Sequence, residues 1–416
     1  MINKKKITNF FVALVLFYFI YTPEFFLMLG FPIRSQYITV ITFLFIVFYI
    51  FIKICLRKKA DLFIDKELFV LFLNIFFASI YFLIVALLNS EDTRFLQNIY
   101  IIVQVCVIIF FLQKLNDSNN KNIKLITLFR LAALQGIISL IMLIIPSTKD
   151  IALRLYYLGG EENYFISAMR IFGLSSDYTF FTPIYHGFLI SIGVYLSLFK
   201  KLNLFKYLPF ILVAVVLNGR TGLILATGLS TFVFLAYTIS NSSKLYDSLK
   251  VIVIVFLSLI IIINILETIN PRTYAWIYSS FEELYYLLFR NEATGTFSTL
   301  DTMFLLPTGV SLLFGEGFRL YGNTKGLIHS DIGFVNDLFL GGILYTSILY
   351  TAQLIFFSKL SFVHKKYDRV ILFSIFLATW LVSNYKGESS RGGLILIGMI
   401  ITKIILRELY TESKES

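Results

Sequence analysis

Cysteine, histidine and acidic side chains are scarce in this sequence. Its 416 residues include two cysteines, three histidines, and 25 Asp and Glu against 36 Lys and Arg. Cys55 and Cys106 both lie in or beside apolar runs, so no disulfide framework is expected. Long polar stretches are almost absent too, because hydrophobic residues make up 58% of the chain. This composition excludes an ordinary soluble domain.

Apolar runs long enough to cross a bilayer recur along the whole chain. A hydrocarbon core of roughly 30 Å needs about 20 mainly apolar residues per helix. Twelve such runs can be marked, at residues 10–29, 37–56, 68–88, 95–112, 123–145, 180–198, 205–217, 221–239, 251–266, 332–357, 370–383 and 392–405. The first run has no small-residue cleavage site after it, which indicates an anchor rather than a removed signal peptide. We therefore expect an all-α, polytopic integral membrane protein of about twelve transmembrane helices, with residues 1–416 forming one domain.

Basic residues are distributed unevenly between the two sides that these spans define. An even number of spans places both termini on one side, and Lys and Arg are retained preferentially on the cytoplasmic side. With the termini cytoplasmic, the inner segments hold more basic residues than the outer ones. The net charge of +11 is then a topology signal, and the lipid bilayer rather than a nucleic acid is the expected partner.

The two sides also differ in the kind of cation. Inner cations are mainly Lys, whereas the outer ones are mainly Arg, whose planar guanidinium binds phosphate through paired hydrogen bonds. For Arg34, Arg94 and Arg154, solvated surface positions are the simpler interpretation. The outer arginines that we regard as candidate ligands for a phosphate or sugar are Arg170, Arg220, Arg290, Arg319 and Arg391.

Two short hairpins indicate a polar cavity on the outer side. The run 204–218 is about 22 Å long as a helix, so the NGRTG turn at 218–222 is expected to stop below the membrane surface. A charged residue at that depth, here Arg220, must face a water-filled cavity or a partner. The alternative is a tight hairpin whose Arg220 extends outward to the interface. The last hairpin, 384–391, is equally shallow and contains Arg391.

One long outer loop, residues 268–331, interrupts the series of spans. Its stretches 274–289 and 302–314 are typical of amphipathic or re-entrant helices, and its glycine-rich run 314–319 could bring backbone N–H groups near an anion. His329 and Asp331 close the loop, and a His beside a carboxylate can act as a general base. The alternatives are a surface histidine without a role and an Asp331 that caps the next helix.

Several of these motifs together resemble the bacterial O-antigen polymerase family (Wzy). They are RIFGL at 170–174, NGRTG at 218–222, and GEG at 315–317 leading to HSDIGF at 329–334 and the glycine pair at 341–342. The arrangement of a dozen spans with one large late loop is similar too, and it extends the resemblance over nearly the whole chain. In the ligase branch of this superfamily the late loop carries a fuller His motif, which is reduced here to His329 with an acidic neighbour.

The resemblance implies a glycosyltransferase with a GT-C-like membrane fold in the bacterial cytoplasmic (inner) membrane. Such an enzyme moves a glycan en bloc from undecaprenyl pyrophosphate onto another lipid-linked repeat at the extracytoplasmic face, building O-antigen, capsule or a similar polysaccharide. Donor and acceptor are then undecaprenyl-pyrophosphate-linked oligosaccharides, and a chain-length regulator is a further candidate partner. On this view Arg170, Arg220, Arg290, Arg319 and Arg391 bind pyrophosphate or sugar, while His329, Asp331 and Arg220 carry the catalysis.

Two further observations complete the sequence-based expectation. The chain has no Asp-x-Asp pair of the kind that holds a metal for a nucleotide-sugar donor, so we expect neither a metal nor a cofactor. An O-antigen ligase-type transferase and a polysaccharide or lipid transporter (flippase) remain the alternatives. A transporter typically places ionisable groups near the membrane midplane within repeated halves, and no internal repeat is visible here.

Overall fold

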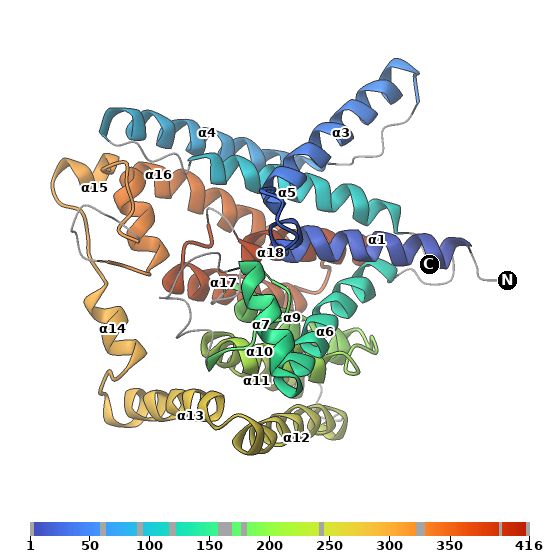
Figure 1. Ribbon diagram of the computed structural model, residues 1–416, viewed down its shortest axis with the longest axis vertical. Coiled ribbons are helices and arrows are strands. Elements are labelled where there is room, and N and C mark those ends of the chain that lie inside the picture. The colour runs from blue at the N-terminus through green and yellow to red at the C-terminus, as the bar shows by residue number, and fades with distance from the viewer. Residues whose placement is uncertain are drawn as a thin grey trace.

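The computed structural model is helical throughout its described part. It describes residues 4–58, 64–89, 95–115, 122–156, 169–175, 181–240, 245–321, 329–390 and 393–412, and within these ranges it contains no β-strand (Figure 1). The helices are α1 Lys4–Tyr21, α2 Phe25–Met28, α3 Ser35–Cys55, α4 Lys66–Asn89, α5 Phe95–Lys114, α6 Ile123–Ile144, α7 Pro146–Tyr156, α9 Phe181–Phe199, α10 Leu208–Asn218, α11 Arg220–Ser240, α12 Leu245–Ile269, α13 Pro271–Tyr285, the π-helical turn η2 Tyr286–Arg290, α14 Thr296–Thr302, α15 Val310–Phe314, α16 Gly333–Ser358, α17 Lys366–Lys386 and α18 Leu394–Glu412.

Among the described helices, seven are long and apolar enough to cross a membrane, namely α3, α4, α5, α6, α9, α11 and α16. The fold is therefore that of a helical membrane protein. The other predicted runs also coincide with helices, namely α1, α10, α12, α17 and α18. That all of these cross the bilayer stays a prediction.

Two predicted helices are interrupted in the structure. The first run, 10–29, is divided because α1 ends at Tyr21, where Thr22 adopts a positive φ of 44° and Pro23 disfavours helix in the residue before it. In the outer loop the stretch 302–314 is not one helix. Pro307 and Gly309, which has a φ of 62°, separate α14 from α15.

Helix α9 forms the centre of the bundle, with nearly all of its side chains buried. Glycines bring its neighbours unusually close. A Cβ added at Gly187 of α9 would lie 2.5 Å from the carbonyl oxygen of Gly222, and one added at Gly222 would overlap the Pro183 carbonyl. Small residues at such contacts allow helix backbones to approach within a membrane. Gly222 therefore fixes α11 against α9, and with it the position of Arg220 at the start of α11.

Helix α16 is broken, and the outer loop fills the break. Gly342 has φ 65° and ψ −166°, a conformation that is essentially restricted to glycine. The carbonyl oxygens of Phe339 and Leu340 accept hydrogen bonds from the N–H groups of Glu316 and Gly317, at 2.6 and 3.2 Å. The prediction that the glycine-rich run presents its N–H groups to an anion is therefore wrong for these two. They replace helix hydrogen bonds that the break removes, as buried backbone groups require.

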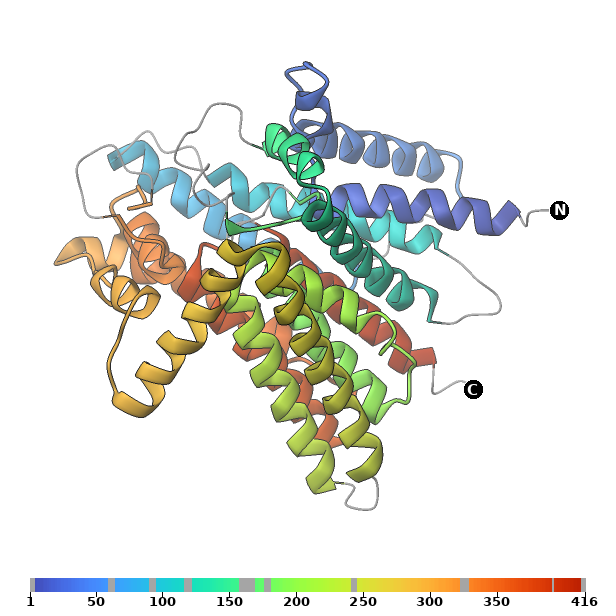
Figure 2. The same cartoon turned by 60° about the horizontal axis from the view of Figure 1, so that its bottom comes forward.

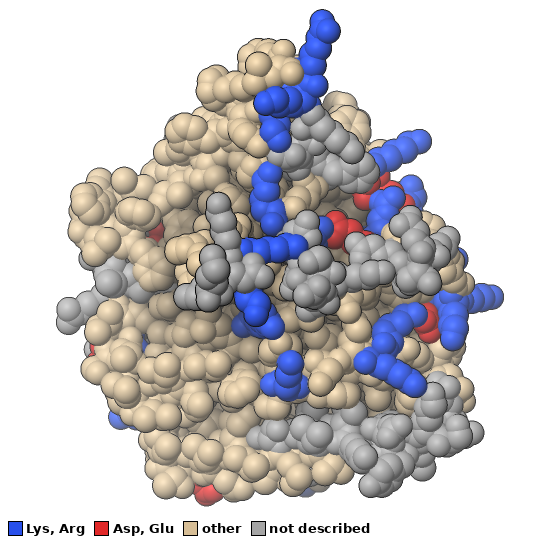
Figure 3. Space-filling model, turned by 90° about the vertical axis from the view of Figure 1, so that its right-hand side faces the viewer, with Lys and Arg blue, Asp and Glu red and all other residues tan. Residues whose placement is uncertain are grey.

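One side of the molecule is rich in basic residues. Figure 3 views the side of Figure 1 on which both ends of the chain are marked, and Lys and Arg outnumber Asp and Glu on it. In Figure 2 the outer-loop helices α14 and α15, drawn in gold to orange, lie on the opposite side from these ends. Both termini thus share a basic face, the arrangement that a cytoplasmic location would produce.

Candidate functional site

Arg220 is held at the turn between α10 and α11 by residues of the outer loop. Its Nη1 donates to Ser279 Oγ at 3.0 Å and to Glu283 Oε1 at 3.1 Å, and its Nη2 donates to Thr296 Oγ1 at 2.7 Å. The side chain is only 20% exposed. Because α10 has just 11 residues, roughly 16 Å of helix, its turn ends well short of a full membrane span. Arg220 thus contacts a partner carboxylate within the protein instead of extending to solvent.

Trp276 brings Arg170 beside Arg220. The guanidinium carbon of Arg170 lies 4.9 Å from the Trp276 ring centroid, and that of Arg220 lies 5.3 Å from it. The segment of Arg170 is fixed by Ile171 N–H, which donates to the Leu217 carbonyl at 2.9 Å at the end of α10. One indole therefore stabilises two cations that would otherwise repel each other.

Arg220 lines a cavity of about 420 Å³ that is otherwise largely apolar, whereas Arg170 is not among its lining residues. Arg220, Glu283 and Thr296 line one part of it, and Lys386, the last residue of α17, lines another. The remaining lining includes Ile224, Phe297, Leu300, Phe334, Leu381 and Val382. Such a cavity suits a ligand with an anionic head and an apolar body.

Lys386 lies three residues beyond the predicted span 370–383, and its pKa depends on the charges around this cavity. Burial lowers the pKa of Lys386, and the nearby cations Arg170 and Arg220 lower it further. The carboxylates of Asp331 and Glu283 act in the opposite direction. Asp331 is therefore close enough to influence the same cavity, although it closes the outer loop.

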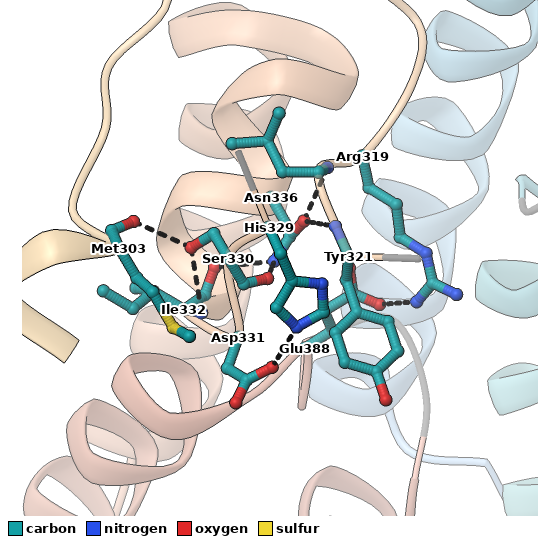
Figure 4. A network of polar contacts seen from close by, with 10 residues as sticks. Met303, Arg319, Tyr321, His329, Ser330, Asp331, Ile332, Asn336 and Glu388 are labelled. Atoms are coloured by element: carbon teal, nitrogen blue, oxygen red, sulfur yellow. Dashed lines mark hydrogen bonds and ion pairs between the residues drawn. The ribbon is translucent and has the colours of Figure 1, made fainter. Parts of the chain in front are cut away.

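A second cluster surrounds His329 (Figure 4). His329 Nε2 lies 2.8 Å from Asp331 Oδ1, and its ring centroid is 4.9 Å from that of Tyr321. The histidine side chain is 49% exposed, so an incoming ligand can reach it. The interpretation of Asp331 as a helix cap is wrong, because Ile332 occupies the N-cap of α16 and no side chain caps that helix.

Next to this cluster, Asn336 links the segment that ends at Tyr321 to the segment that begins at His329. It is fully buried on α16, and its Oδ1 accepts from the N–H groups of Leu320 and Tyr321 at 2.9 and 3.0 Å. Its Nδ2 donates to the carbonyl oxygens of Ser330 and Ile332. One amide side chain thus fixes the segments that carry Arg319 and His329 (Figure 4).

The remaining predicted arginines do not all meet at the Arg220 cavity. Arg319 forms an ion pair with Glu388 of the last hairpin and lies 4.9 Å from the Tyr321 ring centroid. It lines a different, polar cavity of about 230 Å³. Arg290 is exposed, with its guanidinium 5.7 Å from the Tyr286 ring centroid, and it does not line the Arg220 cavity. Arg391 lies outside the described residues.

Several residues of the site were not among the predicted ones. Trp276, Glu283, Lys386 and Asn336 became visible only in three dimensions. Asn336 left a signal in the sequence, because an amide inside an apolar run needs a buried partner. Within the described ranges, no group of three or more His, Cys, Asp or Glu side chains is arranged to hold a metal ion.

Comparison with known proteins adds no further evidence. No protein-family model, curated protein or solved structure matches this chain.

Proposed function

We propose that the chain is a polysaccharide polymerase that transfers glycan from undecaprenyl pyrophosphate onto a second lipid-linked repeat at the extracytoplasmic face. The observation that carries the proposal is the cavity at Arg220. There Arg220 and Lys386 lie beside apolar walls, and Arg170 contacts the same Trp276 ring as Arg220. A lipid pyrophosphate has the matching chemistry, since its anionic head continues directly into a hydrocarbon chain.

The cations would act on the leaving group. The acceptor hydroxyl oxygen forms a bond to the anomeric carbon of the donor, and the bond from that carbon to the pyrophosphate oxygen breaks. The electron pair leaves with the lipid pyrophosphate, so negative charge grows where Arg170, Arg220 and Lys386 are placed. Three of the five N–H groups of Arg220 bind protein acceptors, which leaves two for the phosphate.

The proton of the acceptor hydroxyl would pass to the pair formed by His329 and Asp331. His329 is accessible, and Asp331 holds one of its ring nitrogens at 2.8 Å. An imidazole oriented by a carboxylate is a competent general base. The Asp331 carboxylate raises the pKa of Lys386, which supports the proposal that the base and the cation cavity serve the same reaction.

The proposal is tested by Arg220→Ala and Arg220→Lys in cells that depend on this chain for their surface polysaccharide. Loss of one pre-positioned charge donor typically lowers turnover by roughly 10²- to 10³-fold, so the Arg220→Ala cells should show polysaccharide collapsed to a single repeat. Arg220→Lys should restore part of the ladder, because an ammonium keeps the charge but not the forked geometry. Arg34→Ala is the matched control, since it removes an exposed arginine on the same expected side.

Other results of this experiment would indicate a different function for the chain. A normal ladder of chain lengths in Arg220→Ala cells refutes the catalytic role of the cavity. Absence of any repeat at the outer face, with precursor retained inside, indicates a transporter. Polymer that accumulates on lipid but never reaches its final acceptor indicates a ligase-type transferase.

A further inference from the structure

A third cavity lies between α4 and α16. Its volume is about 600 Å³. Val70 of α4 and Ile348 and Ile355 of α16 contribute apolar walls, and Lys66, Lys359 and Arg407 line it where their helices begin or end. Val70, Ile355, Lys66 and Lys359 are exposed, so the cavity is a groove that opens to the surroundings of the bundle.

The basic residues in and next to this groove differ in whether a carboxylate neutralises them. Lys403 is 2% exposed and pairs with Glu67 at 2.9 Å, and Arg407 pairs with Asp65. Among the described residues, no carboxylate forms an ion pair with Lys66 or Lys359. The groove therefore carries excess positive charge at Lys66 and Lys359, together with its apolar walls.

The location of the groove defines what can occupy it. Lys66 begins α4, Lys359 follows the last residue of α16, and α18 ends five residues after Arg407. In the topology predicted from the sequence, all three positions lie on the same side as both chain ends. The two apolar helices α4 and α16 extend from there into the hydrocarbon region. Basic pockets between membrane helices on the cytoplasmic side are suited to anionic lipid headgroups.

We propose that this groove binds an anionic phospholipid of the leaflet on the side of the chain termini. Lys66 and Lys359 bind the phosphate, and the acyl chains lie along Val70, Ile348 and Ile355. The site is separate from the Arg220 cavity and does not depend on the function proposed for it. A soluble anion would use only the mouth of the groove, whereas a phospholipid fits both the charged mouth and the apolar walls.

The test is native mass spectrometry of the purified full-length chain titrated with phosphatidylglycerol or with phosphatidylcholine. The wild type should bind phosphatidylglycerol more tightly. The double variant K66Q/K359Q should lose roughly ten- to thirtyfold in affinity for it, because each basic residue near a lipid surface contributes on the order of 1 kcal/mol. Thr351→Phe, which fills the groove without changing its charge, should weaken binding as well.

A matched variant separates the groove from general attraction to a basic face. K206Q/K365Q removes two exposed lysines that do not line the groove, and it should bind phosphatidylglycerol as the wild type does. The proposal is overturned if both double variants lose affinity equally. The proposal is also overturned if the wild type binds the two lipids equally. It is overturned as well if K66Q/K359Q and Thr351→Phe both leave binding unchanged.

Discussion

Replacing Gly342 with alanine should release the outer loop from the break in α16. A Cβ at this position would overlap the Leu313 carbonyl and lie 2.6 Å from the Gly315 nitrogen. The backbone conformation costs ~1–3 kcal/mol for any other residue. Withdrawal of the loop also breaks the hydrogen bonds from Glu316 and Gly317, at ~0.5–1.5 kcal/mol each. The substitution should therefore destabilise the docked state by ~1–3 kcal/mol, which is comparable to what these two hydrogen bonds contribute to docking.

Hydrogen–deuterium exchange measures this loss directly at the amides of Glu316 and Gly317. Both amides should exchange faster in Gly342→Ala, while α9 at the centre of the bundle keeps its protection. Gly309→Ala is the control, because Gly309 also has a positive φ, of 62°, but a Cβ there meets no atom within 4 Å. It reports backbone strain alone. Equal exchange at Glu316 and Gly317 in the two variants would show that the loop is not held by the break in α16.

Three further predictions concern the site. Trp276→Ala should raise the donor KM roughly tenfold, because each cation–π contact contributes ~0.5–1 kcal/mol. Trp276→Phe should give an intermediate KM. An unchanged KM in both variants would contradict the arrangement in which one ring contacts both arginines. Because the pKa of Lys386 is lowered by folding, the unfolded chain binds more protons between that value and 10.5, so stability should rise with pH in this interval. In thermal unfolding, the stability of Lys386→Met should not rise with pH in this interval, and at neutral pH the variant should be more stable than the wild type but turn over more slowly. If the stability of the variant still rises with pH, Lys386 is not the cause. Asn336→Ala should destabilise this contact by roughly 2–4 kcal/mol, since the N–H groups of Leu320 and Tyr321 lose their acceptor, and unaltered hydrogen exchange at these two amides would argue against that function of Asn336.

Much of the helical architecture could be predicted from composition alone. Apolar runs of about 20 residues have few alternatives to helix in a bilayer, because every backbone group must be paired within its own segment. The predicted helices that are interrupted in the structure involve the same requirement for backbone pairing. At Pro23, Pro307 and Gly342 the chain departs from helix, and only Gly342 lies inside a run that otherwise is one helix. The break at Gly342 depends on contacts with loop residues more than 20 positions earlier in the chain, so no local sequence pattern predicts it.

The sequence by itself determined that this chain is helical and membrane-embedded in character, and that arginines gather in its polar outer segments, because hydropathy and charge are local properties of each run. Only the tertiary structure decided which of those cations lie close together. Arg170 and Arg220 meet on Trp276, and Lys386 joins them from a hairpin 166 residues further along than Arg220. Arg319, by contrast, is paired with Glu388. Water and salt screen electrostatic interactions over roughly 10 Å, so charge in a sequence becomes a binding site only where packing brings the side chains together.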